Sequence, residues 1–283
     1  MNNGLSGIKN IIWALAIVVA LAAVLVGLII TMVLGFGGQR QDGTLYLGEG
    51  SALSSGGSGG TSSGSGGVDG GLDAGAGAMA LPGSQDTGLE YLFNLTFLCD
   101  ESFAAVGSFG ANFGSTASAQ VWLPAGGSLP AADAAGTRII YPNDGTEKSP
   151  ADAAGLYQPS RLVIYLGGDA LGSTDQASFV TGYTALVREI QAASPETRII
   201  CCSIGSVATA YAGVDGLTPE LVRQANQWIE QVCADTGVYY ADVGSLLNDT
   251  SGALSAEYAS ADGRGINSSG ISKVMEYFRM HGI

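Results

Sequence analysis

The chain has 283 residues, with 25 acidic and 11 basic side chains and a net charge of −14 near neutral pH. Residues 41–283 carry all 25 acidic residues and nine of the basic ones, a net charge of −16. A surface of this kind repels nucleic acids and anionic lipids, so a nucleic-acid-binding function is excluded.

The first element in chain order is an apolar run, IIWALAIVVALAAVLVGLIITMVL, in residues 11–34. Its 24 residues would form a helix of ~36 Å, which is long enough to cross a bilayer. A cleaved signal peptide is the alternative, but the run is long for one and lacks a small-x-small exit. The sequence therefore predicts a short cytoplasmic head (1–10) and a transmembrane signal anchor (11–35). The protein would be a single-pass protein of the cell membrane with its C-terminal part extracytoplasmic.

Residues 48–88, the greater part of a predicted linker over 36–88, are rich in glycine and serine, with almost no large apolar side chain to bury. Such a segment cannot offset its ordering entropy, so we expect a disordered linker. The folded domain is predicted to occupy residues 89–283.

In that domain short apolar runs alternate with amphipathic ones. The predicted strands are 92–99, 119–123, 137–141, 161–166, 197–204 and 238–243. The predicted helices are 175–194, 218–237 and 267–282. The second helix has a clear start, with Thr218 as its N-cap and Pro219 at its first position.

Alternation of strands and helices at this spacing predicts an α/β fold with a doubly wound parallel sheet. Ligands of such sheets lie beyond the carboxyl ends of the strands. The residues that follow two predicted strands, 100–102 and 167–172, are therefore expected at one mouth. The four cysteines (Cys99, Cys201, Cys202 and Cys233) match no zinc spacing. We expect buried free thiols, with one disulfide as the alternative.

Four blocks of the domain resemble the SGNH/GDSL hydrolases. They are FLCDESFAAVG after the first strand, LVIYLGGDALG, SPETRIICCSI, and DGRGINSSG before the last helix. The resemblance implies a flavodoxin-like three-layer fold. It also implies the family's chemistry: a serine nucleophile activated by a histidine and an aspartate, and an oxyanion held by backbone N–H groups, a glycine and an asparagine.

The chain departs from the family pattern at the positions that carry this chemistry. Asp100 matches the aspartate of the first block, which leaves Glu101 in the place of the nucleophilic serine. Ser102 lies one position late, and on a helical turn this slip would rotate its side chain away from the mouth. Asp169 takes the place of the oxyanion asparagine. Near the C-terminus, Asp262 matches the triad aspartate.

The place of the catalytic histidine holds Gly265. The only histidine, His281, lies near the end of the last predicted helix and is expected to be a solvated residue. The glycine of the second block matches Gly126 or Gly127. Gly126, with Gly167, Gly168 and Arg264, forms the predicted ligand-binding set.

Two functions follow from these departures. The first is a membrane-tethered pseudoenzyme that acts as a binding or scaffold module at the cell envelope, with a glycan or a protein as partner. The alternative is an active esterase or acetyl-hydrolase on acylated envelope glycans, using Ser102 or a carboxylate-based site. The missing imidazole favours the first function.

Several of these residues also have ordinary structural roles. Asp100 is suited to cap the helix that follows, Glu101 to its first turn, and Asp262 to a turn with Gly263. Trp122 and Trp228 are expected in the core.

If Glu101, Asp169 and Asp262 converge, their charges need a partner. Arg264 is the favoured counter-ion and no cofactor is required. The alternative is a Ca²⁺ or Mg²⁺ ion held by these three carboxylates.

Overall fold

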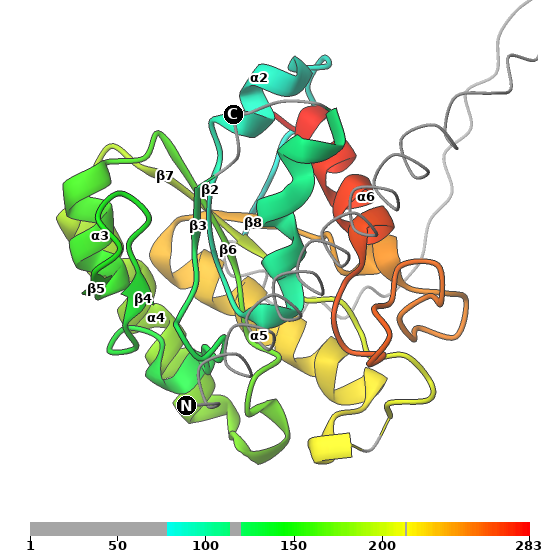
Figure 1. Cartoon of the computed structure of the whole chain (residues 1–283). Coiled ribbons are helices and arrows are strands. Elements are labelled where there is room, and N and C mark those ends of the chain that lie inside the picture. Colours follow the sequence, from blue (N-terminus) through cyan, green and yellow to red (C-terminus); the bar gives the residue numbers. More distant parts are fainter. Residues whose placement is uncertain (1–77, 114–119, 213) are drawn as a thin grey trace, which may run out of the picture. The chain divides into compact units, whose positions relative to one another are not determined.

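Six parallel strands form the main sheet of the computed structural model, which describes residues 78–283 apart from 114–119 and 213 (Figure 1). The strands are β1 (Met79–Ala80), β2 (Thr96–Cys99), β3 (Gln120–Trp122), β6 (Arg161–Tyr165), β7 (Arg198–Cys202) and β8 (Tyr239–Ala241). Their order is β1-β8-β7-β6-β2-β3, and every neighbouring pair is parallel. The predicted α/β fold with a parallel sheet is confirmed.

The central strands are the nearly continuous apolar runs of the sequence. All four residues of β2 are buried, as are the last four of β6 and of β7. Strands covered on both faces need apolar side chains at every position, which explains the missing alternation.

Helices cover both faces of this sheet (Figure 1). They are α2 (Gly88–Phe93), the 3₁₀ helix η1 (Glu101–Phe113), α3 (Pro150–Tyr157), α4 (Gln176–Ala193), α5 (Pro219–Thr236) and α6 (Ser268–Arg279). On one face α4 packs against α3 and α5, and on the other α6 packs against α2 and η1.

Helix α5 begins as predicted. The Thr218 side chain accepts the Leu221 N–H at 3.1 Å, and Pro219 occupies the first helical position. The helix ends at Gly237, whose left-handed backbone (φ 70°) favours glycine.

Short elements complete the described fold. They are the 3₁₀ turns η2 (Ala131–Asp133), η3 (Leu171–Ser173), η4 (Val214–Gly216) and η5 (Ser245–Leu247), and an antiparallel pair, β4 (Ile139–Ile140) and β5 (Glu147–Lys148).

Three sequence predictions need correction. The run 92–99 is a strand only from Thr96, because α2 continues to Phe93 and an apolar run alone does not separate a buried helix from a strand. The run 137–141 lies in the β4–β5 hairpin and not in the main sheet. Strand β1 pairs with β8 from within the predicted linker, so the folded domain starts before residue 89.

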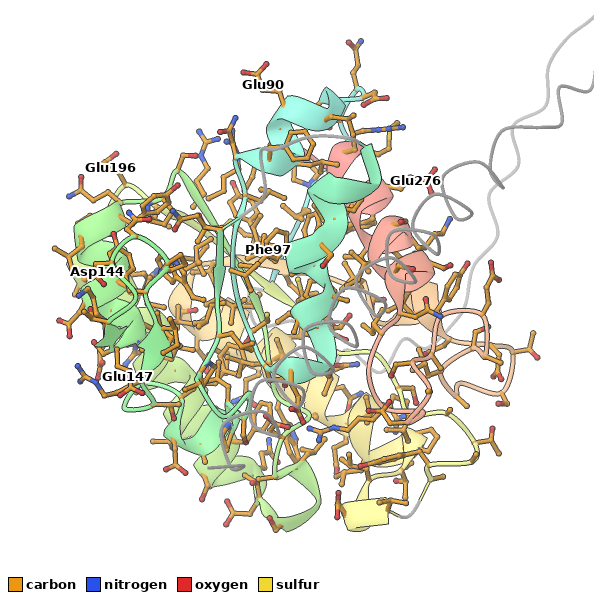
Figure 2. All side chains as sticks on the ribbon, viewed as in Figure 1. Glu90, Phe97, Asp144, Glu147, Glu196 and Glu276 are labelled. Atoms are coloured by element: carbon orange, nitrogen blue, oxygen red, sulfur yellow. The ribbon has the colours of Figure 1, made fainter. Side chains whose placement is uncertain are left out.

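The core holds the residues that the sequence placed there. Trp122 is fully buried and Trp228 nearly so, while all four cysteines are buried free thiols, as predicted. Figure 2 shows Phe97 in the interior, with Glu90, Asp144, Glu147, Glu196 and Glu276 at the periphery.

The described residues contain no helix with the length and apolar composition needed to cross a bilayer. The predicted head, anchor and most of the linker (1–77) lie outside the described residues.

Candidate functional site

The sheet reverses its winding at β2, because β3 lies on one side of it and β6, β7 and β8 follow on the other. Doubly wound sheets bind ligands beyond the carboxyl ends of the strands at such a point. A pocket of about 370 Å³, which we call the β2 pocket, opens beside the residues that follow β2. It is lined by Glu101, Ser102, Ala105, Ser260, Asp262, Arg264, Gly265 and Ile266.

Asp100 is the first residue after β2 and is fully buried. Its Oδ1 accepts the Ser102 N–H at 2.9 Å and also the Ser102 hydroxyl, so Asp100 holds the first turn of η1 as a capping residue does. Its Oδ2 has no hydrogen-bond partner among the described residues. Burial, and then the charge of Asp169, raise the pKa of Asp100 to about 7, against the opposing effect of the Ser102 hydrogen bonds.

Ser102 lines the β2 pocket beside Glu101. The Asp100 carboxylate accepts from both the amide and the hydroxyl of Ser102, while the Ser102 carbonyl accepts the Ile266 N–H at 2.9 Å. The hydroxyl is thus directed to the buried Asp100, and the backbone is tied to Ile266 in the pocket wall. The predicted orientation of the Ser102 side chain relative to the mouth stays a prediction.

Glu101 is the exposed first residue of η1 and lies against Gly127. Its N–H donates to the Gly127 carbonyl at 2.9 Å, and a Cβ on Gly127 would stand 2.8 Å from Glu101 Oε2. Gly127 has a φ of +75°, which also favours glycine. Gly126 is exposed with open space around it, so Gly127 is the glycine that meets the first block.

Asp169 forms a buried ion pair with Arg264, across 95 residues of sequence. The carboxylate keeps only 5% of its side-chain surface exposed, and its second oxygen accepts the Leu129 N–H at 2.7 Å. Arg264 is therefore an internal counter-ion, as the sequence favoured. Both carboxylate oxygens of Asp169 are thus bonded to other residues of the protein.

Asp262 organises the turn that carries Arg264 and Gly265. Its Oδ1 accepts the backbone N–H groups of both residues at 3.0 Å, and also the Ser260 hydroxyl. These bonds, that of Ser260 foremost, lower the pKa of the exposed Asp262 carboxyl. Asp262, which the sequence matched to the family's triad aspartate, therefore has the bonding of a turn former.

Gly265, in the histidine's place, lies against Ser260. A Cβ on Gly265 would stand 2.7 Å from the Ser260 hydroxyl oxygen, closer than such contacts occur. A larger side chain at this position therefore requires Ser260 to move.

Gly167 and Gly168 come shortly after the end of β6. Gly167 has a φ of +131°, and a Cβ there would stand 3.0 Å from the Phe179 ring. Gly168 lines a smaller cavity of about 160 Å³ that also includes Arg264. Gly167 thus serves helix packing, and Gly168 and Arg264 are the members of this group that border a cavity.

His281 lies far from the β2 pocket. The next two residues donate to Ser84 Oγ and Tyr91 Oη, around α2, which precedes the amino end of β2. The imidazole stacks on Tyr277, with ring centres 3.9 Å apart, and its Nδ1 lies 2.8 Å from the Tyr277 carbonyl oxygen. Figure 1 shows the C-terminus beside α2, away from the start of η1.

No three or more His, Cys, Asp or Glu side chains in the described part of the chain are grouped closely enough to hold a metal ion. Glu101 and Asp262 share the β2 pocket, but Asp169 is paired with Arg264 instead. The Ca²⁺ or Mg²⁺ site stays a prediction, which a titration with these ions would test.

Sequence reasoning missed Ser260, which lies against Gly265, and the Leu129 N–H that binds Asp169. The spacing of Ser260 two residues before Asp262 was the one available signal, because such pairs favour side-chain to backbone turns. No local signal marks Leu129.

With this geometry established, comparisons with known proteins identify relatives. The model of the GDSL-like lipase/acylhydrolase family matches residues 108–265, more than half of the chain. The match begins after the first block and ends at Gly265. No curated protein is similar enough to count as a match.

Solved structures with a similar arrangement include three bacterial proteins. A family two carbohydrate esterase from Clostridium thermocellum is 20% identical, with a TM-score of 0.41, over 65% of this chain and 61% of its own. The periplasmic domain of a Salmonella Paratyphi A lipopolysaccharide acetyltransferase is 16% identical, with a TM-score of 0.42, over 71% and 84%. A chain described as a GDSL-like lipase from Parabacteroides merdae is 13% identical, with a TM-score of 0.48, over 71% and 97%.

Proposed function

Because the chain belongs to the GDSL-like lipase/acylhydrolase family but has Gly265 in the place of the family's histidine, we propose that it is a pseudoenzyme. It binds a ligand or partner through the β2 pocket and does not hydrolyse esters there. One observation carries the proposal: the single imidazole of the chain, that of His281, follows α6 near the amino ends of the strands. Ser102 lies beyond the carboxyl end of β2.

The chemistry supports this conclusion. A serine hydroxyl attacks an ester when a positioned base takes its proton, and the developing oxyanion needs donors. The Ser102 hydroxyl instead donates to the buried Asp100, and Asp169 adds a carboxylate in the place of an oxyanion donor. Arg264, the one cation among the described residues that line the pocket, is paired with Asp169.

An esterase assay tests the proposal. The full-length chain, purified in detergent, is assayed with p-nitrophenyl acetate and with acetylated glycans, beside Ser102→Ala and a heat-denatured sample. We expect no turnover above the denatured control and no covalent labelling by a serine-reactive fluorophosphonate. Turnover or labelling that Ser102→Ala abolishes would establish the alternative, a hydrolase that uses Ser102 with Asp100 as its base.

We also propose that residues 11–35 anchor the domain in the cell membrane, with residues 89–283 on the extracytoplasmic side at the cell envelope. The support is the uncharged apolar run of the sequence. The full-length chain should stay with membranes after alkaline extraction. Leu21→Lys combined with Leu25→Lys should release it, because each lysine at a helix centre costs about 3 kcal/mol in the bilayer. Release of the unmodified chain by the alkaline wash would contradict an anchor.

A further inference from the structure

A second pocket, of about 300 Å³, lies at the carboxyl ends of β7 and β8, beside the start of α5. We call it the β8 pocket. Its walls are Ser206, Pro219, Glu220, Val222, Arg223, Asn226, Gln227, Glu230, Tyr240, Asp242, Ser245, Asn248, Ser251 and Gly252. It shares no lining residue with the β2 pocket.

Two residues that line the β8 pocket each carry a buried polar atom that no described residue satisfies. Ser206 is only 2% exposed, and its hydroxyl has no hydrogen-bond partner in the part of the chain that the structure describes. The same is true of the Asn248 side-chain oxygen. Leaving such a group unpaired costs about 1 to 3 kcal/mol, so both atoms favour an occupant that hydrogen-bonds to them.

The frame around these two atoms is, in contrast, well bonded. Asn226 on α5 accepts the Ile204 N–H at 2.8 Å and donates to the Ile204 carbonyl at 3.0 Å. Ser203 donates to Asp242 at 2.8 Å and accepts the Gly244 N–H at 2.7 Å. A Cβ on Gly244 would stand 2.3 Å from the Ile204 carbonyl oxygen, so glycine is required for this close approach of the two loops. The loops that carry Ser206 and Asn248 are therefore held in place without a ligand.

Charge disfavours one kind of ligand. Three carboxylates (Glu220, Glu230 and Asp242) line the pocket against one cation, Arg223, which already donates to Glu220 at 2.6 and 3.0 Å. A phosphate or carboxylate ligand would be repelled, whereas a neutral ligand with several hydroxyl groups supplies the donors that these acceptors need.

The size and the apolar wall agree with this choice. The volume corresponds to about ten water molecules at ~30 Å³ each, which leaves room for one sugar ring. Pro219, Val222 and the Tyr240 ring provide apolar surface beside the polar groups, the mixture typical of small-molecule sites. We propose that the β8 pocket binds a single neutral sugar ring or a polyol of similar size, through hydrogen bonds from its hydroxyls to Ser206 and Asn248.

Saturation-transfer NMR and calorimetry of the full-length chain test this proposal. The detergent must have no sugar headgroup, and the probes are glucose, N-acetylglucosamine and inorganic phosphate. We expect saturable binding of at least one sugar at millimolar concentration and none of phosphate. Ser206→Ala and Asn248→Ala should each weaken sugar binding at least tenfold. Neither variant should lower the melting temperature, because each removes an unsatisfied atom.

Two control variants locate the binding. Ser272→Ala, on the exposed surface of α6, and Ser260→Ala, in the β2 pocket, should leave sugar affinity unchanged. The proposal is overturned if neither sugar binds saturably, if phosphate binds as well as sugar, or if Ser206→Ala and Asn248→Ala bind like the unmodified chain. Loss of sugar binding in Ser260→Ala alone would place the sugar in the β2 pocket and would also overturn it. None of these outcomes depends on whether Ser102 hydrolyses esters.

Discussion

The β2 pocket and the β8 pocket lie at the same edge of the sheet but differ in how their polar groups are used. In the β2 pocket Arg264 binds Asp169, which lies beside the pocket, and Asp262 binds Ser260 and two backbone N–H groups. In the β8 pocket Ser206 and the Asn248 oxygen have no partner among the described residues. Most polar groups of the β2 pocket are therefore hydrogen-bonded within the protein. The β8 pocket contains residues whose polar atoms have no partner in the described part of the chain.

The difference lies in the partners of the polar groups. Asp262 forms a turn through the Gly265 N–H, and Ser260 lies against Gly265. Asp100 is the exception, because its Oδ2 is buried near the charge of Asp169 and has no hydrogen-bond partner among the described residues. Four experiments test this difference between the pockets.

The largest effect is expected from removing the ion pair of the β2 pocket. Asp169→Ala leaves Arg264 without its partner and the Leu129 N–H without its acceptor, so the free energy of unfolding should fall by about 3 kcal/mol. Urea denaturation measures it. The matched control is Glu276→Gln, which breaks an exposed pair with Lys273 and should cost about 0.5 kcal/mol or less. Equal losses in the two variants would mean that the Asp169–Arg264 pair contributes no more than a surface contact.

The next effect is a pH dependence due to Asp100. Its pKa of about 7 in the folded protein exceeds the ordinary 3.8, so the folded state holds more protons between these values. The contribution of Asp100 to the free energy of unfolding is therefore largest below the ordinary pKa and is lost as the pH rises through about 7. The free energy of unfolding falls by at most about 1.4 kcal/mol per pH unit over this range. Asp100→Asn should remove this slope in urea denaturation series from acid to neutral pH, and the variant should be the more stable protein at neutral pH.

Asp262→Asn is the control for the sign of this effect. The pKa of Asp262 is lowered, so its stabilisation is present at neutral pH and is lost as the pH falls through the acid range. At neutral pH the unmodified chain should therefore be more stable than Asp262→Asn but less stable than Asp100→Asn. The same sign in both comparisons would contradict the assignment for Asp100.

A smaller effect is expected at the histidine's place. Gly265→Ala brings a Cβ against the Ser260 hydroxyl and should cost about 1 kcal/mol, as overpacking does. Ser260→Ala should relieve the contact, so the double variant should lose less stability than the sum of the two single ones. Strict additivity would show that Ser260 is not what excludes a side chain at this position.

The smallest effect is expected from divalent metal. Because the Asp169 carboxylate is committed to Arg264 and Leu129, titration with Ca²⁺ or Mg²⁺ at millimolar concentration should give no heat and no rise in melting temperature. Saturable heat that Glu101→Gln and Asp169→Asn abolish would instead establish the metal site.

Local patterns in the sequence were sufficient for the α/β fold class. The apolar runs of β2, β6 and β7 mark strands covered on both faces, and Thr218 with Pro219 marks the start of α5. These signals lie within a few residues of one another, because periodicity and capping act over one or two turns or strands.

The single histidine of the chain is likewise visible from residue identity alone. The sequence did not indicate that Ser102 lines the β2 pocket, that β1 joins the sheet through β8, or that Leu129 binds Asp169. Only the tertiary structure brought Ser206 and Asn248 into one pocket. The physical reason is that these arrangements depend on loops packed together from distant parts of the chain, and no propensity or spacing records which groups such packing leaves paired or unpaired.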